Sequence, residues 1–570
     1  MAEVLSLIPS SPKLDQINHE SLVHFTLFKD LLSYLFKKGN SETDSNHPIV
    51  IILANIKSND DEDTLSSLQT LSDHHKQLLL KYFFNHLNII IIFESDLTPS
   101  TITHLNDLIH NIKLIITNRI SRIQTWTGTG NIELVGDNYI EEKQEINGII
   151  STMSLILTNN INKSFVTSEL IIKLNHLIMK EINFKNLLIN NDPQHLIKLS
   201  ESVRNWSFPA HELSNDDLIY CVFIMLKYAL IQVGKNHSQS SLYILNNNEL
   251  LGFVFMVRDT YKNGNPFHNF RHAVDVLQAC FHFLIRLDCL PQFSSQTYQD
   301  ELIPIIPKNP TSTSTVSSND KEPSPLHSPN HLNHLQTLGL LIAALGHDVG
   351  HPGVTNAFMI KSLAPTSLLY NERSVLESFH SSVFINKILS INWPSLLNVF
   401  TESEKQELTL REIIISSILA TDMAEHFEYI ERLKNLKYND FIKHNNRVKL
   451  ICSLLIKCAD ISNVTRPLRV SSQWAMVLAR EFDEVNILEK KIHHDESLNL
   501  DLSQDLTYTK VPIDLQDILV QNPQLHKGQI FFINTFAENL FNNISELLPE
   551  LKYTCDIIKE NKEFWLNRNT

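Results

Sequence analysis

Glycine is scarce in this chain. Only 13 of its 570 residues are glycine, which is about 2%, whereas soluble domains usually contain roughly 7%. Folds that depend on glycine-rich phosphate loops or on tight β-hairpins need more glycine than this. The scarcity therefore argues against a Rossmann fold, a P-loop fold or a hairpin-rich β fold, and it favours a protein made mainly of helices.

The chain also lacks a surplus of basic residues. It has 48 Lys and Arg residues against 63 Asp and Glu residues, a net charge of -15 with His neutral. Proteins that bind nucleic acids usually carry clustered Lys and Arg that neutralise phosphates. We therefore expect no nucleic-acid partner.

Cysteines and long apolar runs are few as well. The six cysteines form no CxxC pair and are too scattered for a disulfide framework. Apolar runs such as Ile89–Phe93 fall far short of the roughly 20 residues that span a membrane, and the N-terminus does not resemble a signal peptide. We expect a soluble protein without a membrane span, located in the cytoplasm, with the nucleus as the alternative. The sequence sets no oligomeric state.

Hydrophobic residues make up 43% of the chain and charged residues 19%, so most of it should fold. The length allows two to four domains at roughly 100–200 residues each. We divide it into an α/β domain at 1–130, a helical connector at 131–204 and a helical domain at 205–570. A Pro/Ser-rich insertion at about 294–330, expected to be disordered, interrupts the last. In it, Ser324 and Ser328 precede prolines and are candidate phosphorylation sites, although an unmodified loop is an equal interpretation.

The N-terminal domain alternates between β-rich runs and helical patterns. Ile49–Ala54, Ile89–Phe93 and Lys113–Ile116 are expected strands, separated by stretches with apolar residues at helical spacing. This order predicts a small parallel sheet. It is compatible with a receiver-like domain, but no Asp follows the third expected strand. A structural or interaction domain without chemistry is therefore the favoured interpretation.

Two histidines lie four residues apart, about one helical turn. His268 and His272 would project from one face of a helix. Because the chain has 26 histidines, such a pair is weak on its own. It needs partners elsewhere in the sequence.

The partners follow apolar helical stretches. His347-Asp348 ends the stretch 338–345, and Asp460 closes the stretch 450–456. Burying these polar groups is costly unless they are paired. With His272, they give the His…His-Asp…Asp order of an HD-type metal site, suited to a Zn²⁺-like ion with positions left open for water. If Asp348 bridges, a harder ion such as Mg²⁺ could occupy a second site.

The segments around these residues resemble the signatures of class I cyclic-nucleotide phosphodiesterases, and most closely the yeast-type high-affinity cyclic AMP branch. Six segments occur in the family's order: Asn265–Gln278, His347–Asn356, Ser374–Glu377, Ala420–Met423, Cys458–Asn463 and Lys527–Phe532. The likeness extends from about Trp206 to Leu540. Departures occur at Phe267, where Tyr is frequent, at Phe531, where Gly is common, and at Gly350, where Asp is frequent. None is an expected metal ligand.

The resemblance implies an all-helical HD-type phosphodiesterase catalytic domain preceded by a smaller α/β domain. It implies hydrolysis of 3′,5′-cyclic AMP to 5′-AMP, which ends a cyclic AMP signal. A bridging hydroxide activated by two metal ions would attack the phosphorus, and a histidine would act as general acid. The implied cofactors are Zn²⁺ in the tight site and Mg²⁺ or Mn²⁺ in the second.

The resemblance also implies a role for each matching residue. The ligands of the tight ion would be His272, His347, Asp348 and Asp460. Asp348 would also reach the second ion, whose waters would bind His351, Glu377, Thr421 and the less certain Asp422. His268 would be the general acid, oriented by Glu481. The residues in contact with the purine would be Gln529, Phe532, Leu478 and Asn463.

Selectivity for the base requires more than Gln529, because its amide can present a donor or an acceptor. The Asn463 oxygen could accept from the amino group of adenine, whereas guanine would leave buried acceptors unpaired at a cost of about 1–3 kcal/mol. We therefore expect a preference for cyclic AMP. The alternative is that Asn463 merely caps the end of the helix at Asp460.

Two other functions fit the sequence less well. An HD-type phosphohydrolase acting on nucleoside triphosphates would need a basic cluster for the extra phosphates, and the matching segments are poor in Lys and Arg. A cyclic-nucleotide-binding module that has lost catalysis would lack a ligand or the acid, yet His268 and all four expected ligands are present. The phosphodiesterase interpretation is preferred over both.

Overall fold

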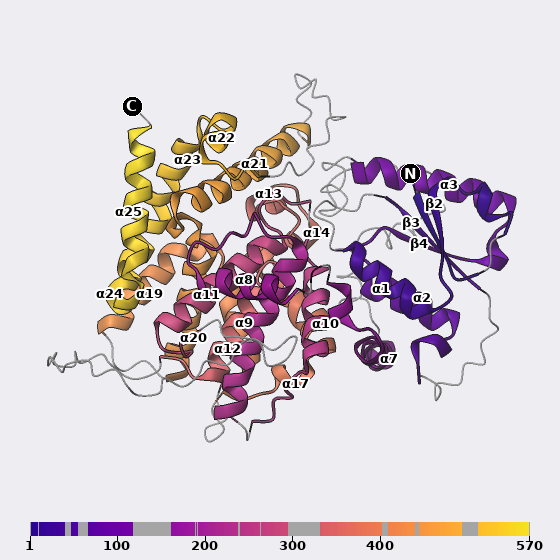
Figure 1. Cartoon of the computed structure of the whole chain (residues 1–570). Helices are drawn as coiled ribbons and strands as arrows, with labels where there is room; N and C mark the ends of the chain where they lie inside the picture. The colour runs from indigo at the N-terminus through magenta and orange to yellow at the C-terminus, as the bar shows by residue number, and fades with distance from the viewer. Residues whose placement is uncertain are drawn as a thin grey trace.

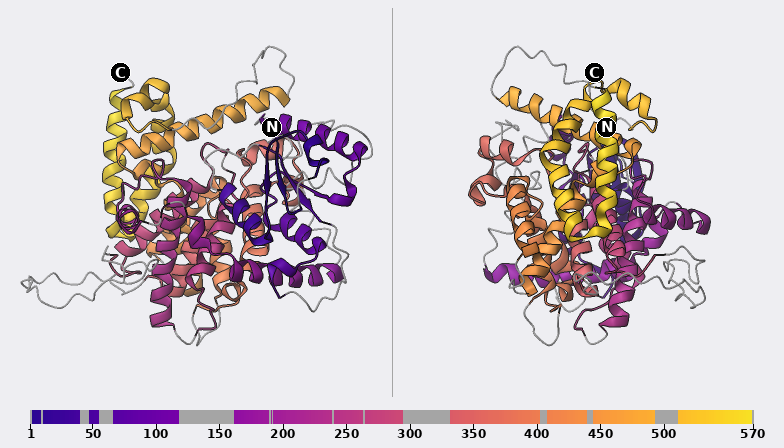
Figure 2. Two further views of the ribbon diagram at one scale, coloured as in Figure 1. Left: turned by 45° about the vertical axis from the view of Figure 1, so that its right-hand side comes forward. Right: turned by 90° about the vertical axis from the view of Figure 1, so that its left-hand side faces the viewer.

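The computed structural model places a small α/β region beside a larger helical body (Figure 1). The two further views in Figure 2 show the same arrangement. The structure describes residues 2–8, 11–39, 47–54, 66–117, 161–188, 190, 192–237, 240–262, 264–293, 331–401, 408–438, 444–492 and 511–568. The Pro/Ser-rich insertion, with Ser324 and Ser328, lies outside the described residues.

Four parallel strands form the N-terminal sheet. They are β1 (Ala2–Ser6), β2 (His19–His24), β3 (Ile49–Leu53) and β4 (Ile89–Phe93), in the order β2-β1-β3-β4. The expected strands at β3 and β4 are confirmed, whereas β1 and β2 were not anticipated. The order matches part of a doubly wound sheet. Ala54, not an aspartate, follows β3.

Helices cover both faces of this sheet. Helices α1 (Phe28–Lys38) and α2 (Asp73–Phe83) pack on one face, and α3 (Pro99–Thr117) packs on the other. Successive side chains of a strand point to opposite faces. Ile51 therefore belongs to the apolar cluster that includes α1 and α2, and Val50 belongs to the cluster that includes α3. Both faces of β3 are therefore buried, which is why every residue of this strand is apolar.

The expected strand at Lys113–Ile116 is wrong, because these residues belong to α3. Ile102, Leu105 and Ile109 recur at helical spacing and are buried against the sheet. This helical pattern continues through the β-branched residues of the expected strand. A local preference for β structure therefore yields to a helix that must cover an open sheet face.

The rest of the described chain is helical, as the sequence predicts. The α-helices are α7 (Ile161–Glu181), α8 (Pro193–Arg204), α9 (Asn215–Asn236), α10 (Asn247–Arg258), α11 (Phe270–Arg286), α12 (His334–Gly346), α13 (Asn356–Lys361), α14 (Pro365–Leu369), α15 (Val375–Val383), α16 (Ser390–Asn392), α17 (Pro394–Leu397), α18 (Leu410–Leu419), α19 (His426–Tyr438), α20 (His444–Asp460), α21 (Leu468–Ile492), α22 (Leu515–Gln521), α23 (Leu525–Phe532), α24 (Glu538–Leu547) and α25 (Lys552–Asn567). Helix α12 packs against α9, α11 and α18 at the centre of the body.

Helix α9 is the one described helix long and apolar enough to cross a membrane by length and composition. However, 78% of its most apolar window is buried inside the protein. Its start is fixed by a capping box between Ser214 and Asp217. Core helices pass the same test, and α9 packs as one.

The α/β region and the helical body share an apolar core. The ring of Phe36 on α1 lies 4.7 Å from that of Phe84, 5.2 Å from that of Phe184 and 6.2 Å from that of Phe255. Phe184 and Phe255 belong to the helical body, and Phe36 is fully buried among these rings. Such edge-to-face contacts add to the stabilisation from buried area, so the two regions are packed together.

A buried arginine at the end of α10 strengthens this junction. The Arg258 guanidinium donates hydrogen bonds to the Asp259 carboxylate and, at 3.1 Å, to the Phe36 carbonyl. The carbonyl of the next residue, Thr260, accepts the Gly350 N–H at 2.9 Å. One turn of chain therefore contacts both α1 and the segment that follows His347-Asp348.

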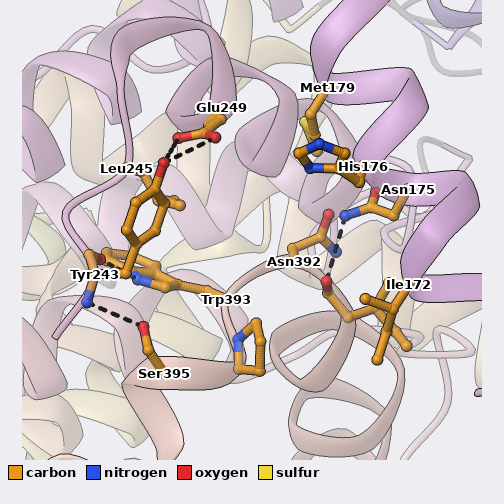
Figure 3. A pocket seen from close by; sticks show the side chains of 12 residues that line it. Ile172, Asn175, His176, Met179, Tyr243, Leu245, Glu249, Asn392, Trp393 and Ser395 are labelled. Carbon is orange, nitrogen blue, oxygen red and sulfur yellow. Dashed lines mark hydrogen bonds between the residues drawn. The ribbon is translucent and has the colours of Figure 1, made fainter. Parts of the chain in front are cut away.

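A cavity of about 250 Å³ lies where α7 meets the helical body (Figure 3). Beside it, Asn175 of α7 donates to the Ile391 carbonyl at 3.3 Å. Across it, the Tyr243 hydroxyl bonds to Glu249, and the Tyr243 N–H donates to Ser395 at 3.2 Å. The Asn175 bond fixes α7 on α16, and the Tyr243 bonds join the segment before α10 to α10 and α17.

We expect Arg258→Met to lower the free energy of unfolding by about 3–5 kcal/mol, because it removes the guanidinium from the buried Asp259 carboxylate and leaves it only His86, at 3.6 Å. Denaturant unfolding of the full chain, followed by circular dichroism, measures this change. The matched control is Arg432→Met, which removes a surface pair with Glu428 and should cost no more than about 1 kcal/mol. Equal, small losses in the two variants would contradict the proposed importance of the junction.

Candidate metal centre and nucleotide site

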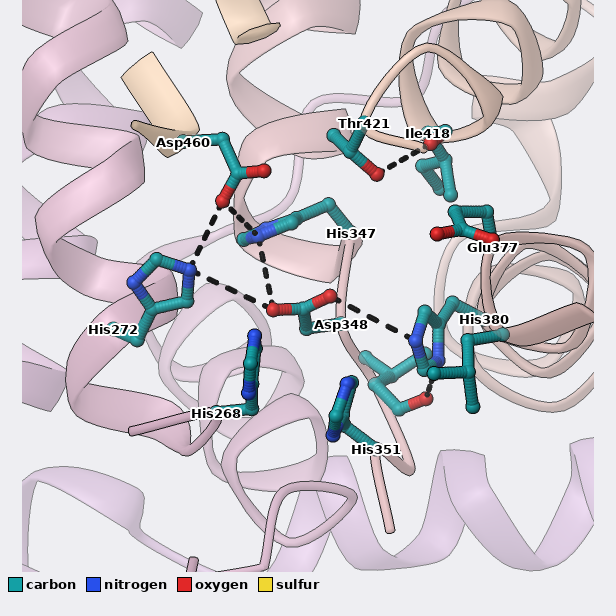
Figure 4. A network of polar contacts seen from close by, with 12 residues as sticks. His268, His272, His347, Asp348, His351, Glu377, His380, Ile418, Thr421 and Asp460 are labelled. Carbon is teal, nitrogen blue, oxygen red and sulfur yellow. Dashed lines mark hydrogen bonds and ion pairs between the residues drawn. The ribbon is translucent and has the colours of Figure 1, made fainter. Parts of the chain in front are cut away.

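Four side chains converge from three helices (Figure 4). His272 lies in the first turn of α11, His347 caps the end of α12 and precedes Asp348, and Asp460 is the last residue of α20. The His272 Nε2 atom is 3.1 Å from Asp460 Oδ1 and 3.6 Å from Asp348 Oδ2. The His347 Nε2 atom is 3.2 Å from Asp348 Oδ2 and 3.4 Å from Asp460 Oδ1.

These distances fit the donor set of a metal ion. Zinc bonds to nitrogen and oxygen of about 2.0–2.1 Å place neighbouring atoms of a tetrahedron about 3.3 Å apart. The four nitrogen-to-oxygen distances span this value. His347 is fully buried and donates from Nδ1 to the Ala344 carbonyl at 2.9 Å. Its Nε2 is therefore directed at the carboxylates, the arrangement of a ligating histidine.

The cluster also requires positive charge. Burial by itself would lower the pKa of His347, but the Asp348 and Asp460 carboxylates outweigh it and hold that pKa well above 6.5. Burial would raise the pKa of Asp348, but the His347 imidazole outweighs it and holds that pKa well below its usual range. Two buried carboxylates thus favour a cation between them, and the donors suit a divalent metal.

A second group of possible ligands adjoins the first. Asp348, His351 and His380 bring their ligand atoms together, with His380 Nε2 3.7 Å from Asp348 Oδ1. The His380 Nδ1 donates to the Val349 carbonyl at 2.8 Å. His380 was not anticipated from the sequence, although it lies three residues after Glu377, a Glu-x-x-His spacing found in metal-binding helices.

Further polar residues surround this second group. Asn356 donates to both carboxylate oxygens of Glu377, at 3.2 and 3.0 Å. Burial, and then the Asp422 carboxylate, raise the pKa of Glu377 to about 7. Ser374, at φ 43°, donates to Asp422 at 2.8 Å, and Thr421 precedes Asp422 in the chain. The Glu377 carboxyl therefore lies near the carboxylates of both Asp422 and Asp348, and the role of these residues around a second ion stays a prediction.

A backbone turn at Gly350 immediately precedes His351. Gly350 has φ 75°, and a Cβ atom there would lie 2.9 Å from the ring of Phe379. Positive φ and close approach both favour glycine at this position. Asn265 then donates to the carbonyls of His351 and His268, both at 2.9 Å. This asparagine, unremarked in the sequence, ties the two histidines together.

His268 and Glu481 form the expected pair. His268 Nδ1 bonds to Glu481 Oε1, while Glu481 Oε2 accepts the N–H groups of Phe267 and His268 at 2.9 and 3.1 Å. The His268 ring stacks on His351 with centroids 4.0 Å apart. Burial lowers the pKa of His268, but Glu481 more than reverses this and raises it to about 9. His268 is therefore an imidazolium near neutral pH.

The expected purine contacts lie on two packed helices. Leu478 shares α21 with Glu481, while Gln529 and Phe532 lie on α23. Leu478 and Phe532 are half-buried. Within the described part of the chain, the buried Gln529 Oε1 atom has no hydrogen-bond partner. It is thus an acceptor available to a ligand N–H group.

Asn463 has a structural task. Its Oδ1 accepts the Val464 N–H at 3.0 Å within the short turn η9 (Ser462–Thr465), and the residue is buried. This bond lies within η9 and does not cap the end of α20 at Asp460. The oxygen expected to meet adenine is already engaged with the backbone.

A helical body with a buried His…His-Asp…Asp set and an adjacent imidazolium defines the class of HD-type metal-dependent phosphohydrolases. Residues 267–558 match the family described as 3′5′-cyclic nucleotide phosphodiesterase. This segment is half of the chain, and the chain belongs to that family.

Similar proteins agree with this membership. The chain is 33% identical over 410 residues to 3′,5′-cyclic-nucleotide phosphodiesterase 2 of Saccharomyces cerevisiae, covering 68% of this chain and 65% of that protein. It is 27% identical over 369 residues to the 3′,5′-cyclic-nucleotide phosphodiesterase regA of Dictyostelium discoideum, covering 64% and 38%. The matches thus span less than two thirds of either relative. A crystal structure of yeast caPDE2 in complex with IBMX is 50% identical, with full coverage of both chains and a TM-score of 0.83.

We expect Asp460→Ala to lose the tight metal ion and much thermal stability, because a buried anionic ligand is removed. An ion present at 100 times its Kd stabilises the folded state by about 2.7 kcal/mol. Elemental analysis should show zinc falling from one equivalent per chain to a small fraction, and calorimetry should show a lower Tm.

A chelator should lower the Tm of the wild type and leave that of Asp460→Ala nearly unchanged. The control Asp514→Ala, which removes an exposed helix cap at α22, should retain its zinc. An Asp460→Ala protein that keeps one tight zinc would show that this ligand is misassigned.

Proposed function

We propose that this protein hydrolyses 3′,5′-cyclic AMP to 5′-AMP and so ends a cyclic AMP signal. The observation that carries the proposal is His268, an imidazolium held by Glu481 beside the metal-ligand cluster. Family membership supports the phosphodiester bond as the target. Similar proteins include a cGMP-specific phosphodiesterase of Dictyostelium discoideum and a probable cyclic-AMP phosphodiesterase of Caenorhabditis elegans, so the base assignment rests on the site itself.

Cleavage of the cyclic phosphodiester releases the O3′ oxygen, which needs a proton as its bond to phosphorus breaks. Glu481 occupies His268 Nδ1, so the proton on Nε2 is available to the leaving oxygen. A positioned acid of this kind accelerates a reaction roughly 10²–10⁴-fold. The Glu481 carboxylate also fixes the orientation of the ring through its bonds to the His268 backbone.

His272, His347, Asp348 and Asp460 would hold a tightly bound Zn²⁺. Asp348, with His351, Glu377, Thr421 and Asp422 around the bound waters, would hold a second ion, Mg²⁺ or Mn²⁺. Bound divalent cations lower the pKa of coordinated water and neutralise charge on a phosphate. The chain contributes the enclosure: His272, His347 and Asp348 are almost completely buried, which strengthens electrostatic interactions inside the site.

Gln529 is the proposed reader of the base. Its buried Oε1 lacks a partner, and the amino group of adenine supplies the N–H that it needs. Guanine presents an oxygen at the same position, which would face the Gln529 oxygen in this amide orientation and would pair only if the amide turned over. Phe532 and Leu478 would cover the two faces of the purine, because aromatic and aliphatic side chains pack well on a flat ring.

The proposed location is the cytoplasm. All six cysteines are free thiols, and five of them are buried. Free thiols persist in reducing compartments, where a second-messenger nucleotide would also be encountered.

In the direct test, purified metal-loaded protein is incubated with cyclic AMP, and the product is identified by chromatography. We expect 5′-AMP, and no turnover after chelation. His268→Ala should lower kcat by about 10²–10⁴ while zinc content stays constant, because the proton donor is lost and the ligands are kept.

The control for this variant is His195→Ala, which removes a histidine paired with Asp217 at 2.6 Å, far along the chain from the metal ligands. It should turn over cyclic AMP as the wild type does. Near-normal turnover by His268→Ala would remove His268 from the acid role. A wild-type protein that leaves cyclic AMP intact in the presence of both metals would refute the proposed function.

We expect kcat/KM for cyclic AMP to exceed that for cyclic GMP by at least about tenfold, since an unpaired buried acceptor costs about 1–3 kcal/mol. Gln529→Ala should lower kcat/KM for cyclic AMP more than for cyclic GMP, so the ratio should approach one. The exposed Gln524 on the same helix offers the control Gln524→Ala, which should leave both values unchanged. Equal wild-type efficiency on the two nucleotides would contradict this account of selectivity.

A further inference from the structure

Lys457 is a fully buried lysine at the edge of the candidate metal centre. It lies on α20, three residues before Asp460. Its ammonium donates hydrogen bonds to the carbonyls of Ala420 and Asp422, both at 3.0 Å. Taking a charged group out of water is costly. A buried lysine at this position therefore indicates a specific role in the site.

The two carbonyls flank Thr421, which follows the end of α18. The Thr421 hydroxyl donates to the Ile418 carbonyl at 2.8 Å, and Lys457 holds the backbone on both sides of this residue. The Tyr429 ring lies 5.5 Å from the ammonium and covers it. This segment, which carries Thr421 and Asp422, is thus held from α20.

Helix α20 therefore contributes two side chains to the site. Its last residue, Asp460, points into the tight cluster, and Lys457 holds the segment that flanks the second group of possible ligands. Because both side chains come from one rigid helix, the separation between Asp460 and the Thr421–Asp422 segment is fixed. Bound ions that share Asp348 depend on such a fixed separation.

We propose that Lys457 is a positioning residue for the second divalent cation, holding Thr421 and Asp422 where the water shell of that ion requires them. This inference rests on the proposed function for the role of the second ion. The sign of the effect distinguishes it from an electrostatic role. An ammonium repels a nearby cation, so if charge dominated, loss of Lys457 would tighten metal binding. If positioning dominates, its loss weakens binding.

The test is Lys457→Met, which keeps the length of the side chain and removes its charge and both hydrogen bonds. Protein loaded with one equivalent of zinc is titrated with Mn²⁺, and free Mn²⁺ is read by electron paramagnetic resonance. We expect the Kd for Mn²⁺ to rise by about 10–100-fold, the usual effect of removing a group that orients metal ligands, while zinc content stays at one equivalent. Unchanged or tighter Mn²⁺ binding would overturn the proposal.

The chain offers a matched control on the same helix. Lys449 bonds to Glu412 of α18 at 3.0 Å, so Lys449→Met also removes a lysine that joins α20 to α18, but does not touch the Thr421 segment. It should bind Mn²⁺ within about twofold of the wild type. An equal loss of affinity in both variants would indicate a general effect of α20 and would overturn the specific role.

Lys457→Arg provides the second variant if the methionine variant does not fold. It keeps the positive charge but carries a wider, planar group, so the two carbonyls cannot be held in the same places, and Mn²⁺ binding should again weaken. If the folded arginine variant has only a lower Tm and binds Mn²⁺ as the wild type does, Lys457 is merely structural. Since Mn²⁺ binding is measured without substrate, the outcome is independent of which nucleotide the protein hydrolyses.

Discussion

Two carboxylates, the buried Asp348 and the largely buried Asp460, approach the same pair of imidazoles, and the rest of the helical body depends on this concentration of charge. Neither carboxylate can be stable so far from water without compensating positive charge. A divalent cation held by these residues would supply that charge where α11, α12 and α20 meet. The apolar stretches 338–345 and 450–456 carry their polar residues just where the helices reach this point. Core packing and chemistry are therefore consequences of one arrangement.

The surroundings of the cluster are held by bonds that converge on a few turns. Asn265 joins His268 to His351, Glu481 joins His268 to α21, and Lys457 joins α20 to the Thr421 segment. The turn at Thr260 extends this support to the α/β region, because the neighbouring Arg258 reaches the carbonyl of Phe36. The N-terminal sheet is consequently packed against the same structure that positions the glycine turn before His351. Its own strand ends carry no carboxylate at β3, where Ala54 follows the strand.

The sequence alone predicted the residues of the metal-ligand cluster, but it did not predict the residues that hold them in place. His347, Asp348 and Asp460 stand out because polar residues at the ends of apolar helical stretches need partners. Lys457 and Asn356 give no such signal, since their partners are backbone carbonyls and a distant carboxylate known only once the chain is folded. His380 had a weak signal in its spacing from Glu377. Lys113–Ile116 was misread because β-branched residues suggest a strand, while the open sheet face decided for a helix. Asn463 fitted both interpretations, and its bond to the Val464 N–H lies within η9, outside the helix end that the capping interpretation named.

The central claim, a divalent metal held by His272, His347, Asp348 and Asp460, is tested most directly by anomalous X-ray diffraction from crystals of the zinc-loaded protein. Data collected on both sides of the zinc absorption edge should show one strong peak enclosed by the four side chains. Its distances to the two histidine nitrogens should be about 2.0–2.1 Å. An active, zinc-loaded crystal with no peak among these residues, or with its tight zinc elsewhere, would contradict the account.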